Sequence, residues 1–217
     1  MKGRNTKKLV TSAMLIALGT AISFICELIP FLNLPVGGTV TVGSLFPVVL
    51  ISYMYGIKWG TASGFVYAIL QMAIGTRTVA ALFTPTDDSY MGYRIALLVI
   101  FIDYICAFTA VGLGGIFAKM RSKTAALVLG SIFSLGLCYF FHTLSGAIFY
   151  GAWAEWFFTD TFIANTAFAR HILSKFSGAS LSWIYSACYN GLYMIPEILI
   201  TALISVPVSK LKTVKRI

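Results

Sequence analysis

Long runs of apolar residues recur along the whole chain and are separated by short polar segments. A helix needs about 20 mostly apolar residues to cross a bilayer. Six stretches meet or approach that length: residues 9–29, 41–56, 59–76, 94–118, 124–149 and 180–209. Only 11% of the 217 residues are charged, against about 25% in a soluble domain. We therefore expect a single all-α integral membrane domain over residues 1–217, with six transmembrane helices and a multi-pass location in the cell membrane.

The basic residues predict the orientation of these six helices. Twelve of the 16 lie in the two tails and in the connections after the second and fourth helices: Lys2, Arg4, Lys7, Lys8, Lys58, Lys119, Arg121, Lys123, Lys210, Lys212, Lys215 and Arg216. The other side has four: Arg77, Arg94, Arg170 and Lys175. Because Lys and Arg concentrate in cytoplasmic loops, both termini are predicted to be cytoplasmic.

The connections predicted on the outer side, 30–40, 77–93 and 150–179, are the long ones. Their length favours capture of a ligand on that side, although their Trp and Phe residues also suit the membrane interface.

Composition argues against several classes of function. The net charge of +9 is spread over helix ends and forms no patch, so we expect no nucleic-acid partner. The four cysteines lie within apolar runs and lack CxxC spacing, which indicates packing residues and predicts no metal site. No enzyme motif is present, so the chain is predicted to be no enzyme and to use no cofactor.

Ala13, Ala17 and Ala21 are spaced four residues apart in the first predicted helix. This spacing makes a stripe of small residues that another helix can approach closely. Packing within the chain's own bundle would produce the same pattern.

Ionisable residues within the spans are candidates for function because they are costly in hydrocarbon. They are Asp103, His142 and Glu197. His142 shares one helical face with Gly146 and Tyr150, at offsets of four and eight residues. An imidazole, a gap and an aromatic ring on one face suit a flat heterocycle, although a histidine bonded to a neighbouring helix is an equal alternative.

The last predicted helix places Tyr185 and Asn190 near its outer end. An asparagine amide both donates and accepts, so it can pair with the edge of a heterocycle. The tyrosine could equally be ordinary aromatic packing.

Several of these segments resemble the thiamine-specific S components, which are the substrate-binding subunits of energy-coupling factor (ECF) vitamin transporters. The stretch Tyr139–Tyr150 (YFFHTLSGAIFY) resembles their fifth helix, and Asp103-Tyr104 lies where that family has a Glu-Tyr pair. Tyr185-Ser186 followed by Asn190-Gly191 resembles their last helix, and the alanine stripe resembles the motif that docks on the coupling subunit.

The resemblance implies a six-helix binding subunit without its own ATPase, which works with a transmembrane coupling subunit and two cytoplasmic ATPases. It implies that thiamine is the ligand and assigns its contacts. Asp103, His142, Tyr185 and Asn190 would bond the aminopyrimidine, and Tyr104 and Tyr150 would lie along the thiazolium. Gly146 and Tyr67 complete the set of eight residues predicted to bind the substrate.

The sequence departs from the family pattern at four points, so a ligand related to thiamine remains an alternative to thiamine itself. Tyr150 and Tyr67 stand where the family has Trp, Asp103 is one methylene shorter than Glu, and the first outer loop has no Trp. The alternatives are an S component for a pyrimidine precursor or another vitamin, and a stand-alone ion-coupled transporter. A membrane enzyme using His142 and Asp103 as acid and base ranks last.

Overall fold

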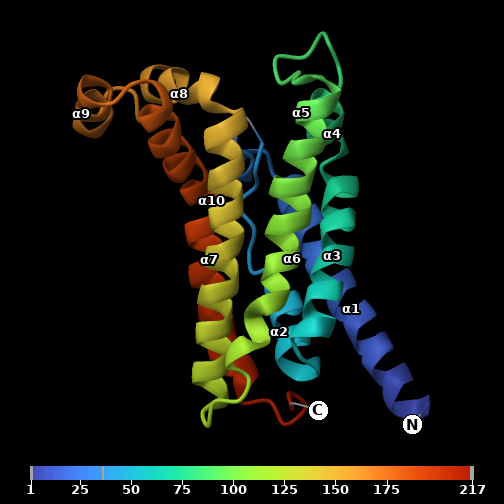
Figure 1. The fold of residues 1–217 in the computed structure, drawn as a ribbon. Helices are drawn as coiled ribbons and strands as arrows, with labels where there is room; N and C mark the ends of the chain where they lie inside the picture. Colours follow the sequence, from blue (N-terminus) through green and yellow to red (C-terminus); the bar gives the residue numbers. More distant parts are fainter. Residues whose placement is uncertain (1, 36, 216–217) are drawn as a thin grey trace.

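The structure, a computed structural model, describes residues 2–35 and 37–215. The chain forms a bundle of helices that run roughly along one axis, and the described residues contain no strand (Figure 1). The α-helices are α1 (Lys2–Glu27), α2 (Phe46–Tyr55), α3 (Ile57–Ile74), α4 (Thr76–Ala81), α5 (Gly92–Val99), α6 (Ala107–Val111), α7 (Lys123–Phe149), α8 (Ala154–Asp160), α9 (Ala167–Lys175) and α10 (Gly178–Ser209). Four shorter helical turns are η1 (Pro30–Leu32), η2 (Ile100–Cys106), η3 (Gly112–Phe117) and η4 (Gly151–Trp153). The expectation of an all-α protein is confirmed.

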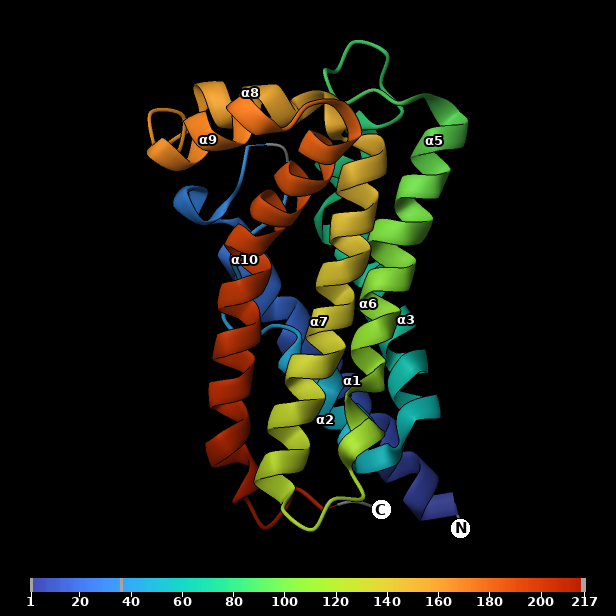
Figure 2. The same cartoon turned by 60° about the vertical axis from the view of Figure 1, so that its left-hand side comes forward.

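Among the residues that the structure describes, four helical stretches are long and apolar enough to cross a membrane. They are Asn5–Glu27, Gly92–Phe117, Lys123–Phe149 and Gly178–Ser209. Between the first two lie α3, with 18 residues, and α2, with ten. The start of α1 and the end of α10 lie at the same end of the bundle, whereas α8 and α9 lie across the opposite end (Figures 1 and 2).

The helix expected over 41–56 begins only at Phe46. Residues 41–45 precede it as irregular backbone, in which Gly43 has a φ of +75° that a helix does not allow. Pro47 lies in the first turn of α2, where its missing N–H costs nothing. Gly56, with φ +90°, then separates α2 from α3, at the boundary that the sequence indicated.

The stretch expected as one helix over 94–118 is continuous but not uniform. Its centre is a π-helical segment, η2, which contains Asp103 and Tyr104, and its end is the 3₁₀ segment η3. Widened turns of this kind occur mostly at functional sites, because they redirect side chains.

The two longest helices, α7 and α10, pack along each other (Figure 2). Hydroxyl groups connect them at intervals, with Thr124 Oγ1 lying 2.7 Å from Ser209 Oγ and Ser131 Oγ lying 3.0 Å from Ser205 Oγ. Nearer the end of the bundle that carries α8 and α9, the Tyr139 hydroxyl donates to the Ala187 carbonyl at 2.7 Å. Small polar residues allow such close approach between membrane helices. The part of this contact beyond Tyr139, away from Ser131 and Ser205, forms one wall of the site described next.

Candidate ligand-binding site

Two adjoining cavities lie inside the bundle, with volumes of about 150 Å³ and about 70 Å³. Both are lined by the π-helical segment η2, by α7 and α10, and by the chain before α2. The residues common to both are Gly38, Thr78, Asp103, Tyr104, His142 and Tyr193. The larger cavity extends towards α1 and α3, and the smaller towards the outer ends of α7 and α10.

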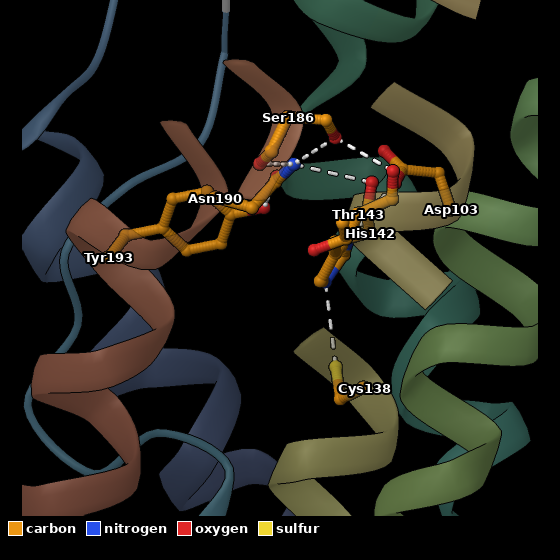
Figure 3. Close-up of polar contacts among 7 residues, drawn as sticks. All are labelled: Asp103, Cys138, His142, Thr143, Ser186, Asn190 and Tyr193. Carbon is orange, nitrogen blue, oxygen red and sulfur yellow. Dashed lines mark hydrogen bonds and ion pairs between the residues drawn. The ribbon is translucent and has the colours of Figure 1, made fainter. Parts of the chain in front are cut away.

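His142 lies at the junction of the two cavities, with both ring nitrogens in contact with protein groups (Figure 3). Nδ1 lies 2.9 Å from Asp103 Oδ1, and Nε2 lies 3.4 Å from Cys138 Sγ. The rings of Phe108 and Tyr193 contact the imidazole edge to face, at centroid distances of 5.7 and 5.8 Å. These four contacts fix the orientation of the ring. The Asp103 side chain, 26% exposed against 7% for His142, is the more open member of the pair.

Asn190 joins α10 to α7 beside this pair (Figure 3). Its Nδ2 group donates to the Ser186 carbonyl at 2.9 Å and to the His142 carbonyl at 3.3 Å, and its Oδ1 accepts from the Tyr193 hydroxyl at 2.6 Å. Ser186 in turn donates to the Thr143 carbonyl at 2.7 Å. Both ends of the Asn190 amide therefore have protein partners, and the amide faces the smaller cavity from a fixed position.

Gly146 is the point where α10 approaches α7 most closely within the site. A Cβ atom on this residue would clash with Ser186 Oγ and would lie 3.1 Å from Asn190 Nδ2. A larger residue here would require Ser186 and Asn190, or α10 itself, to shift, so the glycine permits the packing of these two side chains against α7.

Seven of the eight residues predicted to bind the substrate line the cavities. Both cavities are lined by Asp103, Tyr104 and His142. The other four, Gly146, Tyr150, Tyr185 and Asn190, line only the smaller cavity. Tyr67 lines neither. It is fully buried, with its hydroxyl 3.5 Å from the Gly19 carbonyl and its ring against Phe108.

The alanine stripe lies elsewhere, on the outer face of the bundle. Ala13, Ala17 and Ala21 are exposed and line an apolar groove of about 720 Å³ between α1 and α3. The groove does not share a lining residue with the smaller cavity. The stripe is thus not covered by this chain's own helices.

Other lining residues were not predicted to belong to the site. Thr39, Thr41 and Ser44 line the larger cavity from the segment before α2, together with Glu27 and Glu197. Glu197 is a candidate for function from the sequence, because an ionisable group is costly within a span. Hydropathy, in contrast, gives no indication that residues 41–45 are not helical.

The lining has a one-sided charge. Three carboxyl groups, those of Glu27, Asp103 and Glu197, face the larger cavity, and neither cavity is lined by a described Lys or Arg. The smaller one is lined by tyrosine rings from η2 and α10 and by Tyr150, which directly follows α7. Carboxylates and electron-rich rings together favour a cationic aromatic ligand.

Known proteins resemble this chain in sequence and in fold. A family profile described as "Thiamine transporter protein" matches residues 13–156. The thiamine transporter ThiT of Bacillus subtilis (strain 168) is 29% identical over 212 residues, covering 92% of this chain and 91% of that protein. A solved structure of ThiT from Listeria monocytogenes has 21% identity and a TM-score of 0.64, and the match covers 95% of each chain.

Proposed function

The chain belongs to the thiamine transporter protein family, and from that premise we propose that it is the substrate-binding S component of an ECF-type importer and that its ligand is thiamine. A family of transporters agrees with the expectation that the protein is not an enzyme. The observation that carries the proposal is the paired cavity, which combines carboxyl groups and tyrosine rings with no Lys or Arg among the described residues that line it.

The residues that would contact the ligand's two rings all line the smaller cavity. The aminopyrimidine lies against Asp103, His142, Tyr185 and Asn190. An amino group and a protonated ring nitrogen are donors, and the Asp103 carboxylate is the acceptor they require. The positively charged thiazolium lies along Tyr104 and Tyr150, whose ring faces attract a cation.

The protein crosses the cell membrane six times with both termini in the cytoplasm. The four long spans together with α2 and α3 supply six crossings. The chain starts and ends at one end of the bundle, as an even number requires (Figure 1). Twelve of the 16 Lys and Arg residues belong to that side in the predicted topology, which supports a cytoplasmic location of both termini.

The partners are a transmembrane coupling subunit and two ATPases. The supporting feature is the exposed stripe of Ala13, Ala17 and Ala21, beside an apolar groove wide enough for a side chain of another helix. Small residues exposed on a membrane helix allow a partner helix to approach closely.

Titration of the purified protein in detergent with thiamine tests the proposal, with intrinsic fluorescence as the signal. Trp153 packs in the same cluster as Tyr150 and Tyr185, so the signal reports on the smaller cavity. We expect saturable binding at submicromolar thiamine, lost in His142→Ala. The matched control is His171→Ala, which changes the other histidine, exposed on α9.

Two other outcomes would replace parts of the proposal. Saturable binding of a pyrimidine precursor without any response to thiamine would change the ligand and keep the binding subunit. Ion-coupled uptake into vesicles that contain only this protein would contradict the S-component assignment and support a stand-alone transporter.

A further inference from the structure

The segment 41–45 is irregular backbone that lies within the bundle. Thr41 and residues 43–45 are buried. The first turn of α2 donates to the Gly43 and Leu45 carbonyls, but the N–H groups of Gly43 and Leu45 need acceptors outside the segment. Irregular backbone at membrane depth is tolerated only where the protein itself satisfies its N–H and C=O groups. The stability of this segment therefore depends on what those groups meet.

The partner of this segment is Glu197 of α10. Its Oε2 accepts from the Thr41 hydroxyl at 2.8 Å and from the Gly43 N–H at 2.9 Å, and its Oε1 accepts from the Leu45 N–H at 3.0 Å. Ser44 extends the network by donating to the Thr41 hydroxyl at 3.0 Å. Both carboxyl oxygens of Glu197, a residue only 2% exposed, are occupied by donors from one five-residue segment.

The same segment forms part of the wall of the larger cavity. Thr41, Ser44 and Leu45 line it, as Glu197 does, opposite Asp103 and His142. A change in the path of residues 41–45 would therefore change the shape of the cavity.

Two further contacts hold the preceding residues against the same helix. The Tyr189 hydroxyl donates to the Gly37 carbonyl at 3.0 Å. The backbone at Gly38 lies so close to the Tyr193 ring that a Cβ atom there would be 2.8 Å from it. Of these contacts to α10, those of Glu197 lie deepest along the helix and are the most numerous.

We propose that Glu197 is a positioning residue of the binding site, whose carboxylate holds residues 41–45 in place as a wall of the larger cavity. Its two oxygens are engaged by the protein, so it acts on the ligand through the segment it holds and does not carry protons across the membrane. The role of the segment as a wall of a thiamine site rests on the proposed function, whereas the contact between Glu197 and the segment does not.

The test compares Glu197→Gln with a matched variant of the same helix. The amide of Gln keeps the size of the side chain but presents an NH₂ group to an N–H donor or a hydroxyl, so at least one contact is lost. The control, Ser205→Ala, removes a buried hydroxyl two turns further along α10, where it faces Ser131 of α7 and no cavity.

Hydrogen–deuterium exchange of the ligand-free protein in detergent is the first measurement. We expect the amides of Gly43 and Leu45 to exchange at least about tenfold faster in Glu197→Gln, with exchange in α7 unchanged. Ser205→Ala should leave residues 41–45 unchanged. Unchanged exchange of residues 41–45 in Glu197→Gln would overturn the proposal, whatever the ligand proves to be.

The second measurement is the Kd for thiamine, which we expect to rise at least about tenfold in Glu197→Gln and to stay within about twofold in Ser205→Ala. Thr41→Val, which removes only the hydroxyl contact, provides a second variant if Glu197→Gln does not fold, and it should shift exchange and affinity in the same direction by less. Faster exchange without any loss of affinity would show that the segment is held but does not shape the site, and would overturn the positioning role. Absence of thiamine binding in the unmodified protein would contradict the proposed function and leave the exchange result to decide the contact.

Discussion

His142 is the residue on which the polar contacts of the site converge. Its Nδ1 faces Asp103 and its Nε2 faces Cys138, so both ring nitrogens have partners inside the protein. Asp103 is the more exposed of the pair and lines both cavities. His142 therefore orients the Asp103 carboxylate, and in the proposed function this carboxylate contacts the ligand.

Replacement of Asp103 by Asn should therefore weaken binding strongly. The amide keeps the shape of the side chain but loses the charge, and hydrogen bonds to charged groups contribute about 1.5–3 kcal/mol. We expect the Kd for thiamine to rise roughly ten- to a hundredfold, as measured by fluorescence titration. Asp88→Asn, in the outer loop between α4 and α5, is the control. Equal affinity in both variants would remove Asp103 from the site.

Cys138 was interpreted from the sequence as an apolar packing residue, yet its sulfur lies 3.4 Å from the imidazole. If the thiol orients the ring, Cys138→Ser should bind thiamine within about twofold of the unmodified protein. Cys138→Ala should bind about fivefold more weakly, because a net hydrogen bond contributes about 1 kcal/mol.

Nitrogen-15 NMR of labelled histidine gives a direct readout of this contact. The chain has two histidines, so a His171→Gln background leaves His142 as the sole signal. The Nε2 resonance should shift in Cys138→Ala and shift less in Cys138→Ser. Identical spectra for both variants would restore the packing interpretation.

At the scale of helices, the part of the α7–α10 contact around Gly146 determines whether the site exists. Away from the cavities a hydroxyl pair joins Thr124 to Ser209, and beside the smaller cavity the Ser186 hydroxyl donates to the Thr143 carbonyl. Gly146 permits the closest approach within the site, because its missing side chain leaves room for Ser186.

Gly146→Ala should separate the two helices and disturb the site. Insertion of one methyl group into a packed contact costs about 1–3 kcal/mol, so we expect a lower melting temperature and weaker thiamine binding. Gly136→Ala is a matched control on the same helix, because its Cβ would meet no atom within 4 Å. There the change should be neutral or stabilising, by up to about 1 kcal/mol. Similar melting temperatures for the two variants would contradict this account of the contact.

Hydropathy and spacing predict much of the helical layout. The runs expected over 124–149 and 180–209 correspond to α7 and α10 within two residues at each end. Helical periodicity also placed His142 and Gly146 on one face, and both line the smaller cavity.

What the sequence could not reveal depends on contacts between distant segments. Gly43 and Leu45 bond to a carboxylate 154 and 152 residues away, and apolar composition alone made residues 41–45 look helical. The π-helical segment around Asp103 has no signature in composition. Tyr67 lies on a predicted span, but only the packing of Phe108 against its ring shows that it is held away from both cavities.

At the scale of the whole molecule, two features lie on different parts of the bundle. The smaller cavity, which holds the residues predicted to contact the ligand, lies among η2, α7 and α10, whereas the exposed alanines face outward between α1 and α3. The larger cavity reaches α1 and α3 and shares Ile74 with the groove, but none of the three alanines lines it. Ligand binding and assembly with a partner should therefore be separable by mutation.

Ala17→Trp tests this separation. A large side chain on the stripe prevents close approach of another helix. We expect loss of co-purification with the coupling subunit, while the Kd for thiamine stays within about twofold. Leu129→Trp, at an exposed position on α7, is the control and should leave assembly intact. Normal assembly of Ala17→Trp would place the docking surface elsewhere.

The contacts of Glu197 also bear on the order of events during biosynthesis. Thr41, Gly43 and Leu45 leave the ribosome 152 to 156 residues before the carboxylate that binds them. Until α10 is inserted, two backbone N–H groups lack these acceptors, and such groups are costly in hydrocarbon. We therefore expect residues 41–45 of the nascent chain to stay hydrated, or bound to the insertion machinery, until α10 has been inserted. Chains truncated before residue 197 should remain protease-sensitive around residues 41–45, even where their earlier helices have been inserted.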